Sequence, residues 1–291
     1  MDHAIFDRSD IKPFHDTVQA LRAFFIARGF IEVHTQDRLS ILAACEDPTT
    51  VATYNYAGNV WPLPQTGQMW LEYELLTRPD VPGVFCVSTS YRNEPNPIPG
   101  RHKIIFPMFE FESRGDIGDL QRLEADLLEH LGYGLAASLP RVNYDDVAKR
   151  YGVAELTSEH EMRMKDDLGR AVFLERFPEG TSPFWNMKRT GDGHHSLREG
   201  SGHACKIDVI LDGMETIGSA ERSCDAAAMR ESFHTISDGG YAQLLYKLFG
   251  QDRVERELED FLALPFVPRY GGGIGLSRLI RSLNISKNQN A

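Results

Sequence analysis

The chain has 291 residues, 42% of them hydrophobic and 25% charged, so it is long enough to bury a sizeable core. Its formal net charge of −11 argues against a large nucleic-acid footprint, since proteins that bind phosphate backbones usually carry a basic excess. No apolar run approaches the ~20 residues that cross a bilayer, no secretory signal opens the sequence, and its four cysteines are scattered, which together predict a cytoplasmic protein with reduced thiols and no membrane partner.

Hydrophobic spacing predicts the elements in chain order. A helix is expected from 16 to 30, where Gly29 makes a natural end, and a strand from 31 to 35. We then expect helices at 68–77, 119–131, 145–151, 225–234, 238–263 and 276–283, strands at 84–92 and 104–112, a strand followed by proline-interrupted structure over 171–189, and a hairpin over 206–218. A strand-rich middle with flanking helices predicts an α+β fold with a mainly antiparallel β-sheet flanked by helices.

The hairpin is the most informative segment on physical grounds. Asp212-Gly213 is a preferred dipeptide for a two-residue turn, and it pairs Leu211 with Met214 and so places Asp208 opposite Ile217. In that register the carboxylates of Asp208 and Glu215 share one face as diagonal neighbours, which suits a divalent cation such as Mg²⁺. The alternative is that one or both carboxylates simply face solvent.

Two further segments contain candidate site residues. In the strands at 84–92 and 104–112, alternation places Ser88, Ser90 and Arg92 on one face of the first and Phe106, Met108, Glu110 and Glu112 on one face of the second. Arginines there can hold phosphate or carboxylate, and an aromatic ring can stack on a base, although a surface ion pair and core phenylalanines would give the same pattern. The glycine-rich run 271–275 permits close backbone approach before a helix that carries Arg278.

Taken together, these segments resemble the signature motifs of class II aminoacyl-tRNA synthetases, especially the aspartate/asparagine/lysine subgroup, over residues 14–284. Arg92-Asn93-Glu94 is similar to motif 2, which implies that Arg92 grips the ATP α-phosphate and the substrate carboxylate and that Glu94 contacts the adenine amino group. Arg101 and His102 match the loop that follows. The resemblance also implies that Phe106, on the return strand, stacks on adenine.

The segment 273–279 resembles motif 3, which implies that Arg278 binds the γ-phosphate of ATP. Asp208, Glu215 and Arg222, each seven residues apart, are similar to the family's acidic pair for Mg²⁺-ATP and its substrate-recognising arginine. The implied chemistry is formation of an acyl-adenylate by positioning and electrostatic stabilisation, with ATP and Mg²⁺ required.

Substrate expectations come from the run 66–72, which resembles the Ser-Gly-Gln-Leu-x-x-Glu segment of asparaginyl enzymes. Leu71 stands where aspartyl enzymes and the stand-alone asparagine synthetases of this family carry a lysine, so Glu72 with Arg222 favours an amide-bearing or other hydrogen-donating side chain. A solvent-facing Glu72 is the alternative. Gln68 and Glu46 are further expected substrate contacts, Glu46 for the substrate ammonium.

We expect one class II synthetase-like catalytic domain over residues 1–291, without an anticodon-binding domain. A homodimer is expected, although Gln36 stands near the place of the motif 1 proline. The expected function is an AMP-forming amide ligase that activates an amino acid and transfers it to an amine, like asparagine synthetases of this family. The alternatives are a synthetase paralogue that loads a tRNA, which the charge disfavours, or a protein, and a non-catalytic amino-acid sensor.

Overall fold

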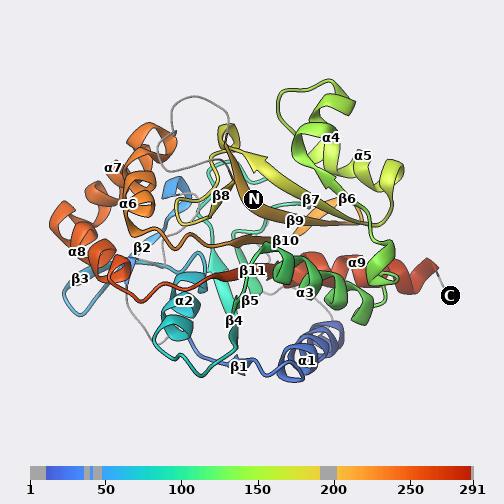
Figure 1. The fold of residues 1–291 in the computed structure, drawn as a ribbon, viewed down its shortest axis with the longest axis horizontal. Helices are drawn as coiled ribbons and strands as arrows, with labels where there is room; N and C mark the ends of the chain where they lie inside the picture. The colour runs from blue at the N-terminus through green and yellow to red at the C-terminus, as the bar shows by residue number, and fades with distance from the viewer. Residues whose placement is uncertain (1–10, 36–39, 42–47, 191–201, 290–291) are drawn as a thin grey trace.

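A nine-stranded, mainly antiparallel sheet organises the chain in the computed structural model (Figure 1), which describes residues 11–35, 40–41, 48–190 and 202–289. The strand order is β1-β4-β5-β11-β10-β9-β7-β6, and β8 pairs with β9. The pairs β1–β4 and β6–β7 are parallel. The strands of this sheet are β1 (Ile31–Glu32), β4 (Gly83–Tyr91), β5 (Ile105–Arg114), β6 (Arg141–Asn143), β7 (Ala171–Pro178), β8 (Arg189–Thr190), β9 (His203–Leu211), β10 (Met214–Glu221) and β11 (Arg269–Gly275).

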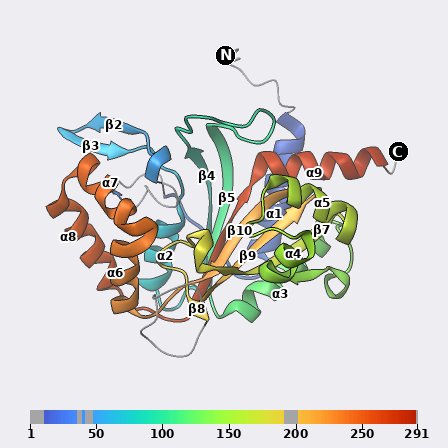
Figure 2. The same ribbon diagram turned by 90° about the horizontal axis from the view of Figure 1, so that it is seen from above.

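Helices cover the sheet in separate groups (Figures 1 and 2). Helices α1, α3 and α9 pack on one face, where the buried phenylalanines of β4 and β5 meet Phe24 and Phe25. Helices α4 and α5 pack near β7, while α6, α7 and α8 form a cluster of their own. The helices are α1 (Ile11–Ile26), α2 (Gln68–Leu76), α3 (Ile117–His130), α4 (Tyr144–Tyr151), α5 (Ser158–Leu168), α6 (Ala226–Thr235), α7 (Gly240–Phe249), α8 (Gln251–Leu262) and α9 (Leu276–Gln289).

The α+β class and the mainly antiparallel sheet are confirmed, but several expected elements differ. The single helix expected over 238–263 is two helices, because Gly250 lies between them with φ of +86°. The glycine run, for which no strand was expected, forms a central strand, β11. Helix α5, the short strands β6 and β8, and the small hairpin of β2 (Thr53–Tyr56) and β3 (Asn59–Pro62) were not expected. No helix of the described ranges is long and apolar enough to span a membrane.

The hairpin turn has the expected backbone, with φ of +47° at Asp212 and +77° at Gly213. It is nevertheless buried, and the Asp212 side chain is fully inaccessible. Arg170 donates two hydrogen bonds to its carboxylate, of 3.1 and 2.8 Å, and Ser282 of α9 donates a third of 2.5 Å. These bonds fasten the tip of the β9–β10 hairpin to helix α9.

Candidate active site

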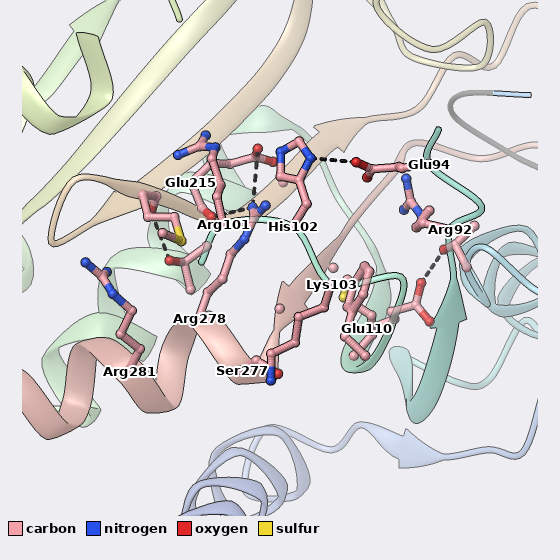
Figure 3. Close-up of a pocket in the computed structure, with 18 of the residues that line it drawn as sticks. Arg92, Glu94, Arg101, His102, Lys103, Glu110, Glu215, Ser277, Arg278 and Arg281 are labelled. Atoms are coloured by element: carbon pink, nitrogen blue, oxygen red, sulfur yellow. Dashed lines mark hydrogen bonds and ion pairs between the residues drawn. The ribbon is translucent and has the colours of Figure 1, made fainter. Parts of the chain in front are cut away.

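One cavity of about 500 Å³ opens on the sheet face opposite α1 and α3, and the first turns of α9 reach its edge. Figure 3 shows its wall, to which strands β5, β10 and β11, the loop between β4 and β5, the start of α2 and helix α9 contribute. A cavity of this size holds a ligand as large as a nucleotide. Its lining residues are Thr66, Gln68, Arg92, Glu94, Gly100, Arg101, His102, Lys103, Phe106, Met108, Glu110, Met214, Glu215, Thr216, Gly218, Gly273, Gly275, Ser277, Arg278 and Arg281.

The β4–β5 pair forms one side of the cavity, with the face assignment that alternation predicts. Ser90 pairs with Phe106 and Ser88 with Met108, so these side chains share one face, and Phe109 on the other face is fully buried in the core. The Arg92 guanidinium lies 6.0 Å from the centre of the Phe106 ring. A cation and an aromatic ring thus stand side by side at the cavity wall.

Glu110 fixes the floor of the cavity to helix α2. Its buried carboxylate accepts hydrogen bonds of 3.0 and 2.9 Å from the main-chain nitrogen of Gly67, one of 2.5 Å from the Ser88 hydroxyl and one from the Thr66 hydroxyl. A carboxylate is favourable beside the first amides of a helix. Glu110 therefore positions Thr66 and Gln68, which both line the cavity.

The loop between β4 and β5 is held in place by a carboxylate–imidazole contact and by an ion pair. Glu94 Oε2 lies 2.5 Å from His102 Nδ1, as Figure 3 shows. Arg101 donates a 2.5 Å hydrogen bond to Glu161 of α5, whose other oxygen accepts one of 2.7 Å from the Glu215 main chain. Helix α5 thus connects this loop to the acidic strand β10.

The carboxylates of Asp208 and Glu215 lie together as expected, although one expected residue pair between β9 and β10 was wrong. A bulge after Glu215 shifts the register, so Asp208 pairs with Gly218 and not with Ile217. A Cβ placed on Gly218 would lie 3.2 Å from Glu215 Oε1 and 3.7 Å from Asp208 Oδ1, so both carboxylates lie over this glycine. The solvent-facing alternative is wrong for Asp208, which is 7% exposed.

Asp208 has the features of a ligand for a hard cation. Its Oδ1 is buried and has no hydrogen-bond partner among the described residues, while Oδ2 is 2.9 Å from Lys206 Nζ. Burial raises the pKa of Asp208 to about 7 against the lowering effect of Lys206, and the carboxylate of Glu215 contributes to this rise. An orphaned oxygen beside a second carboxylate fits Mg²⁺.

The glycines of β11 give the cavity its backbone floor. A Cβ on Gly273 would lie 2.7 Å from Met108 Cε, and one on Gly271 only 2.1 Å from Glu112 Cδ. Neither glycine has a positive φ, so glycine is required at these positions because a side chain would not fit. Helix α9 follows β11 at once and directs Arg278 and Arg281 to the cavity (Figure 3).

The remaining predicted substrate residues belong to a buried charge cluster beside the cavity. Glu72 is fully buried, so the solvent-facing alternative is wrong. Its Oε2 accepts a 2.8 Å hydrogen bond from Arg269, and its Oε1 accepts one of 2.6 Å from the Asn186 amide. Arg222 is 3.9 Å from Glu72 and instead donates to Glu112 Oε1, at 3.0 and 2.5 Å. Burial raises the pKa of Glu112 to about 8, although Arg222 lowers it.

The predicted ATP residues thus lie in or beside one cavity, and Glu72 and Arg222 lie next to it with Gln68 between. Glu46 and Gln36 lie outside the described residues. Sequence reasoning missed four side chains that position the others, for which the sequence carried no motif: Asn186, Glu161, Lys206 and Arg269.

Comparison with known proteins agrees with this geometry. The family of class II tRNA synthetases of the D, K and N type matches residues 7–289, and the chain belongs to this family. It is similar to the asparagine–tRNA ligase of Koribacter versatilis (strain Ellin345), with 22% identity over 91% of this chain and 63% of that protein. The chain therefore spans less than two thirds of the length of that relative.

Solved structures share the fold. The asparaginyl-tRNA synthetase from Pyrococcus horikoshii, complexed with asparaginyl-adenylate, superposes with a TM-score of 0.73 at 20% identity, over 94% of this chain and 64% of that one. The Entamoeba histolytica asparaginyl-tRNA synthetase, also complexed with asparaginyl-adenylate, gives 0.71 at 18% identity, over 94% and 63%. At 20% and 18% identity these likenesses show a shared fold.

Proposed function

We propose that the chain is an AMP-forming ligase that activates the carboxylate of a small amino acid as an acyl-adenylate and transfers it to a small amine. The observation that carries this proposal is that Arg92, Arg278 and Glu215 line one cavity with an aromatic wall, and that the Asp208 carboxylate lies beside that of Glu215 over Gly218. These groups are the cation donors, metal ligands and base-stacking surface that a bent nucleoside triphosphate needs.

Each group has an assigned task in the first half of the reaction. Phe106 stacks on adenine, Glu94 accepts from its amino group, and Arg101 and His102 border the nucleotide from the loop. Arg92 and Arg278 bind the α- and γ-phosphates and neutralise charge as the substrate carboxylate attacks the α-phosphorus and pyrophosphate leaves. Mg²⁺ held by Asp208 and Glu215 would add a further positive charge on the phosphates.

The second half of the reaction transfers the acyl group. The amine attacks the adenylate carbonyl, an amide forms and AMP leaves with the bonding electrons. The acidic net charge of −11 favours a small acceptor over a nucleic acid. Family membership favours the competing candidate, aminoacylation of a tRNA or a protein.

Amino-acid-dependent ATP–pyrophosphate exchange tests the first half. We expect exchange with at least one small polar amino acid, and its loss in Arg278→Ala. No exchange with any amino acid would refute adenylation and leave a ligand sensor. For the second half, AMP release that depends on ammonia or a small amine supports the amide ligase. Labelled amino acid on an acid-precipitable tRNA or protein would refute the amide ligase and support aminoacylation of that macromolecule.

A further inference from the structure

A second, much smaller cavity of about 20 Å³ adjoins the first and shares Gln68 with it. A space of this size holds about one water molecule or the few atoms at the tip of a small side chain. Its other lining residues are Met69, Glu72, Phe184, Asn186, Met187 and Arg222. Most of its polar groups belong to the buried charge cluster described above.

Asn186 is fixed in this wall by both its main chain and its side chain. Its carbonyl accepts a 2.8 Å hydrogen bond from the Ser223 nitrogen, and Met187 forms a strand-like bridge with Arg222. Its Nδ2 donates to Glu72 Oε1 at 2.6 Å. Because a carboxylate oxygen accepts from the amide nitrogen, the orientation of the Asn186 amide is set.

The other end of that amide has no assigned role in the fold. Asn186 is 1% exposed, and its Oδ1 is buried with no hydrogen-bond partner among the described residues. The oxygen and nitrogen of an amide point in different directions, so Oδ1 is directed away from Glu72. Leaving a buried acceptor unpaired costs on the order of 1–3 kcal/mol, so such a group calls for a ligand or another partner.

We propose that Asn186 is a specificity-determining residue of the amino-acid site, whose Oδ1 accepts a hydrogen bond from the N–H of a carboxamide at the end of the substrate side chain. This inference rests on the proposed function. A carboxamide donates to Asn186 and offers its oxygen to the Arg222 guanidinium. A carboxylate has no hydrogen to donate and is repelled by Asn186 Oδ1 and Glu72.

The experiment compares wild type with Asn186→Ala on three probes in pyrophosphate exchange. The probes are asparagine, aspartate, and 2-amino-4-oxopentanoate, which has a methyl ketone in place of the carboxamide and so lacks the N–H group. In wild type we expect asparagine to exceed both others by at least about tenfold in kcat/KM, the size of one lost hydrogen bond to a buried acceptor. Asn143→Ala is the matched control, because Asn143 is exposed on β6.

In Asn186→Ala we expect kcat/KM for asparagine to fall about tenfold, through KM, while the methyl ketone changes less than threefold and KM for ATP stays constant. An equal fall for asparagine and the methyl ketone would overturn the inference, because Asn186 would then serve only to hold Glu72. If the variant does not fold, the wild-type comparison decides, and less than threefold discrimination against the methyl ketone overturns the inference.

Calorimetric binding of the same probes, without ATP, separates this inference from the proposed function. If wild type shows no exchange but binds asparagine at least tenfold more tightly than the methyl ketone, adenylation fails and the role of Asn186 stands. If wild type shows exchange with other amino acids and does not bind asparagine, adenylation stands and the role of Asn186 fails.

Discussion

Arg278 Nη1 donates a 2.7 Å hydrogen bond to the main-chain carbonyl of Glu215, and the Glu215 carboxylate lies 3.7 Å from the same nitrogen. The arginine of α9 is thus positioned by the strand that carries half of the acidic pair. One guanidinium nitrogen holds the strand, and the planar fork leaves other donors directed at the cavity.

Arg278→Lys should therefore disable catalysis without unfolding the chain. A lysine keeps the charge but loses the fork, so it cannot hold Glu215 and a phosphate in the same geometry. We expect kcat/KM for ATP in pyrophosphate exchange to fall ~100-fold. Arg256→Lys, at an exposed position of α8, is the control and should retain full activity. Full activity in Arg278→Lys would contradict the role assigned to the guanidinium fork.

Glu215→Gln should raise the Mg²⁺ concentration that pyrophosphate exchange requires. Replacing one of two anionic oxygen ligands weakens a hard-cation site, so the Mg²⁺ concentration for half-maximal exchange should rise by about tenfold or more. Titration of MgCl₂ at fixed ATP measures it. Glu155→Gln, at an exposed position outside the cavity, is the control. Chelation of Mg²⁺ should stop exchange in wild type, and exchange that continues would refute the metal requirement.

Two alanine substitutions in β11 should have different effects, one on substrate binding and the other on stability. In Gly273→Ala the new Cβ meets the flexible end of Met108, so the protein should fold, with raised KM for substrates because the methyl group enters the cavity. In Gly271→Ala it meets Glu112 and, at 2.4 Å, the main-chain oxygen of Phe111, so the sheet must shift. We expect a loss of 3 kcal/mol or more, on the order of severe overpacking, in urea unfolding.

Gly180→Ala is the matched control for both, since a Cβ there meets nothing within 4 Å. It should have wild-type stability and kinetics. Equal stability of Gly271→Ala and Gly180→Ala would show that the close packing of β11 on β5 tolerates a side chain.

Glu124 of α3 should make stability depend on pH. It is fully buried, neither carboxylate oxygen accepts a hydrogen bond from a described residue, and burial raises its pKa from 4.5 to about 8. Because the folded pKa is above the unfolded one, the favourable contribution is complete below pH 4.5 and is lost as pH rises through about 8. Ionisation of this group should cost on the order of several kcal/mol at pH 9.

Urea unfolding at pH 6 and pH 9 measures this effect. Glu124→Gln should reduce the loss between the two pH values, and the remainder should come from Glu112 and Asp208, whose pKa values burial also raises. Asp126→Asn, at an exposed position of the same helix, should keep the full loss. Equal pH dependence in wild type and Glu124→Gln would refute the assignment to Glu124.

The sequence was informative wherever one element carries its own pattern. Alternation along β4 and β5 placed Ser90 and Phe106 on the shared face, and the Asp212-Gly213 turn brought Asp208 to Glu215. The bulge after Glu215 was not predictable, because register slips depend on packing against neighbouring elements rather than on local propensity.

Contacts between residues far apart in the sequence could not be predicted either. Glu72 was expected to face a ligand, but Arg269 and Asn186, which follow it by 197 and 114 residues, bind both of its oxygens. Nothing in the local sequence of β11 or of the segment after β7 specifies these contacts. Charge pairs of this kind arise only when the sheet brings distant strands together.

The buried turn at Asp212 has a consequence for motion. Ser282 joins it to α9, and Arg278 joins the same helix to Glu215, so the hairpin and the helix are tied at two points along their length. The acidic pair and the arginine assigned to the γ-phosphate therefore travel as one rigid body. Widening of the cavity for nucleotide entry must then come from the opposite rim, where the loop that carries Glu94 and His102 would have to break the Arg101–Glu161 hydrogen bond that connects it to α5.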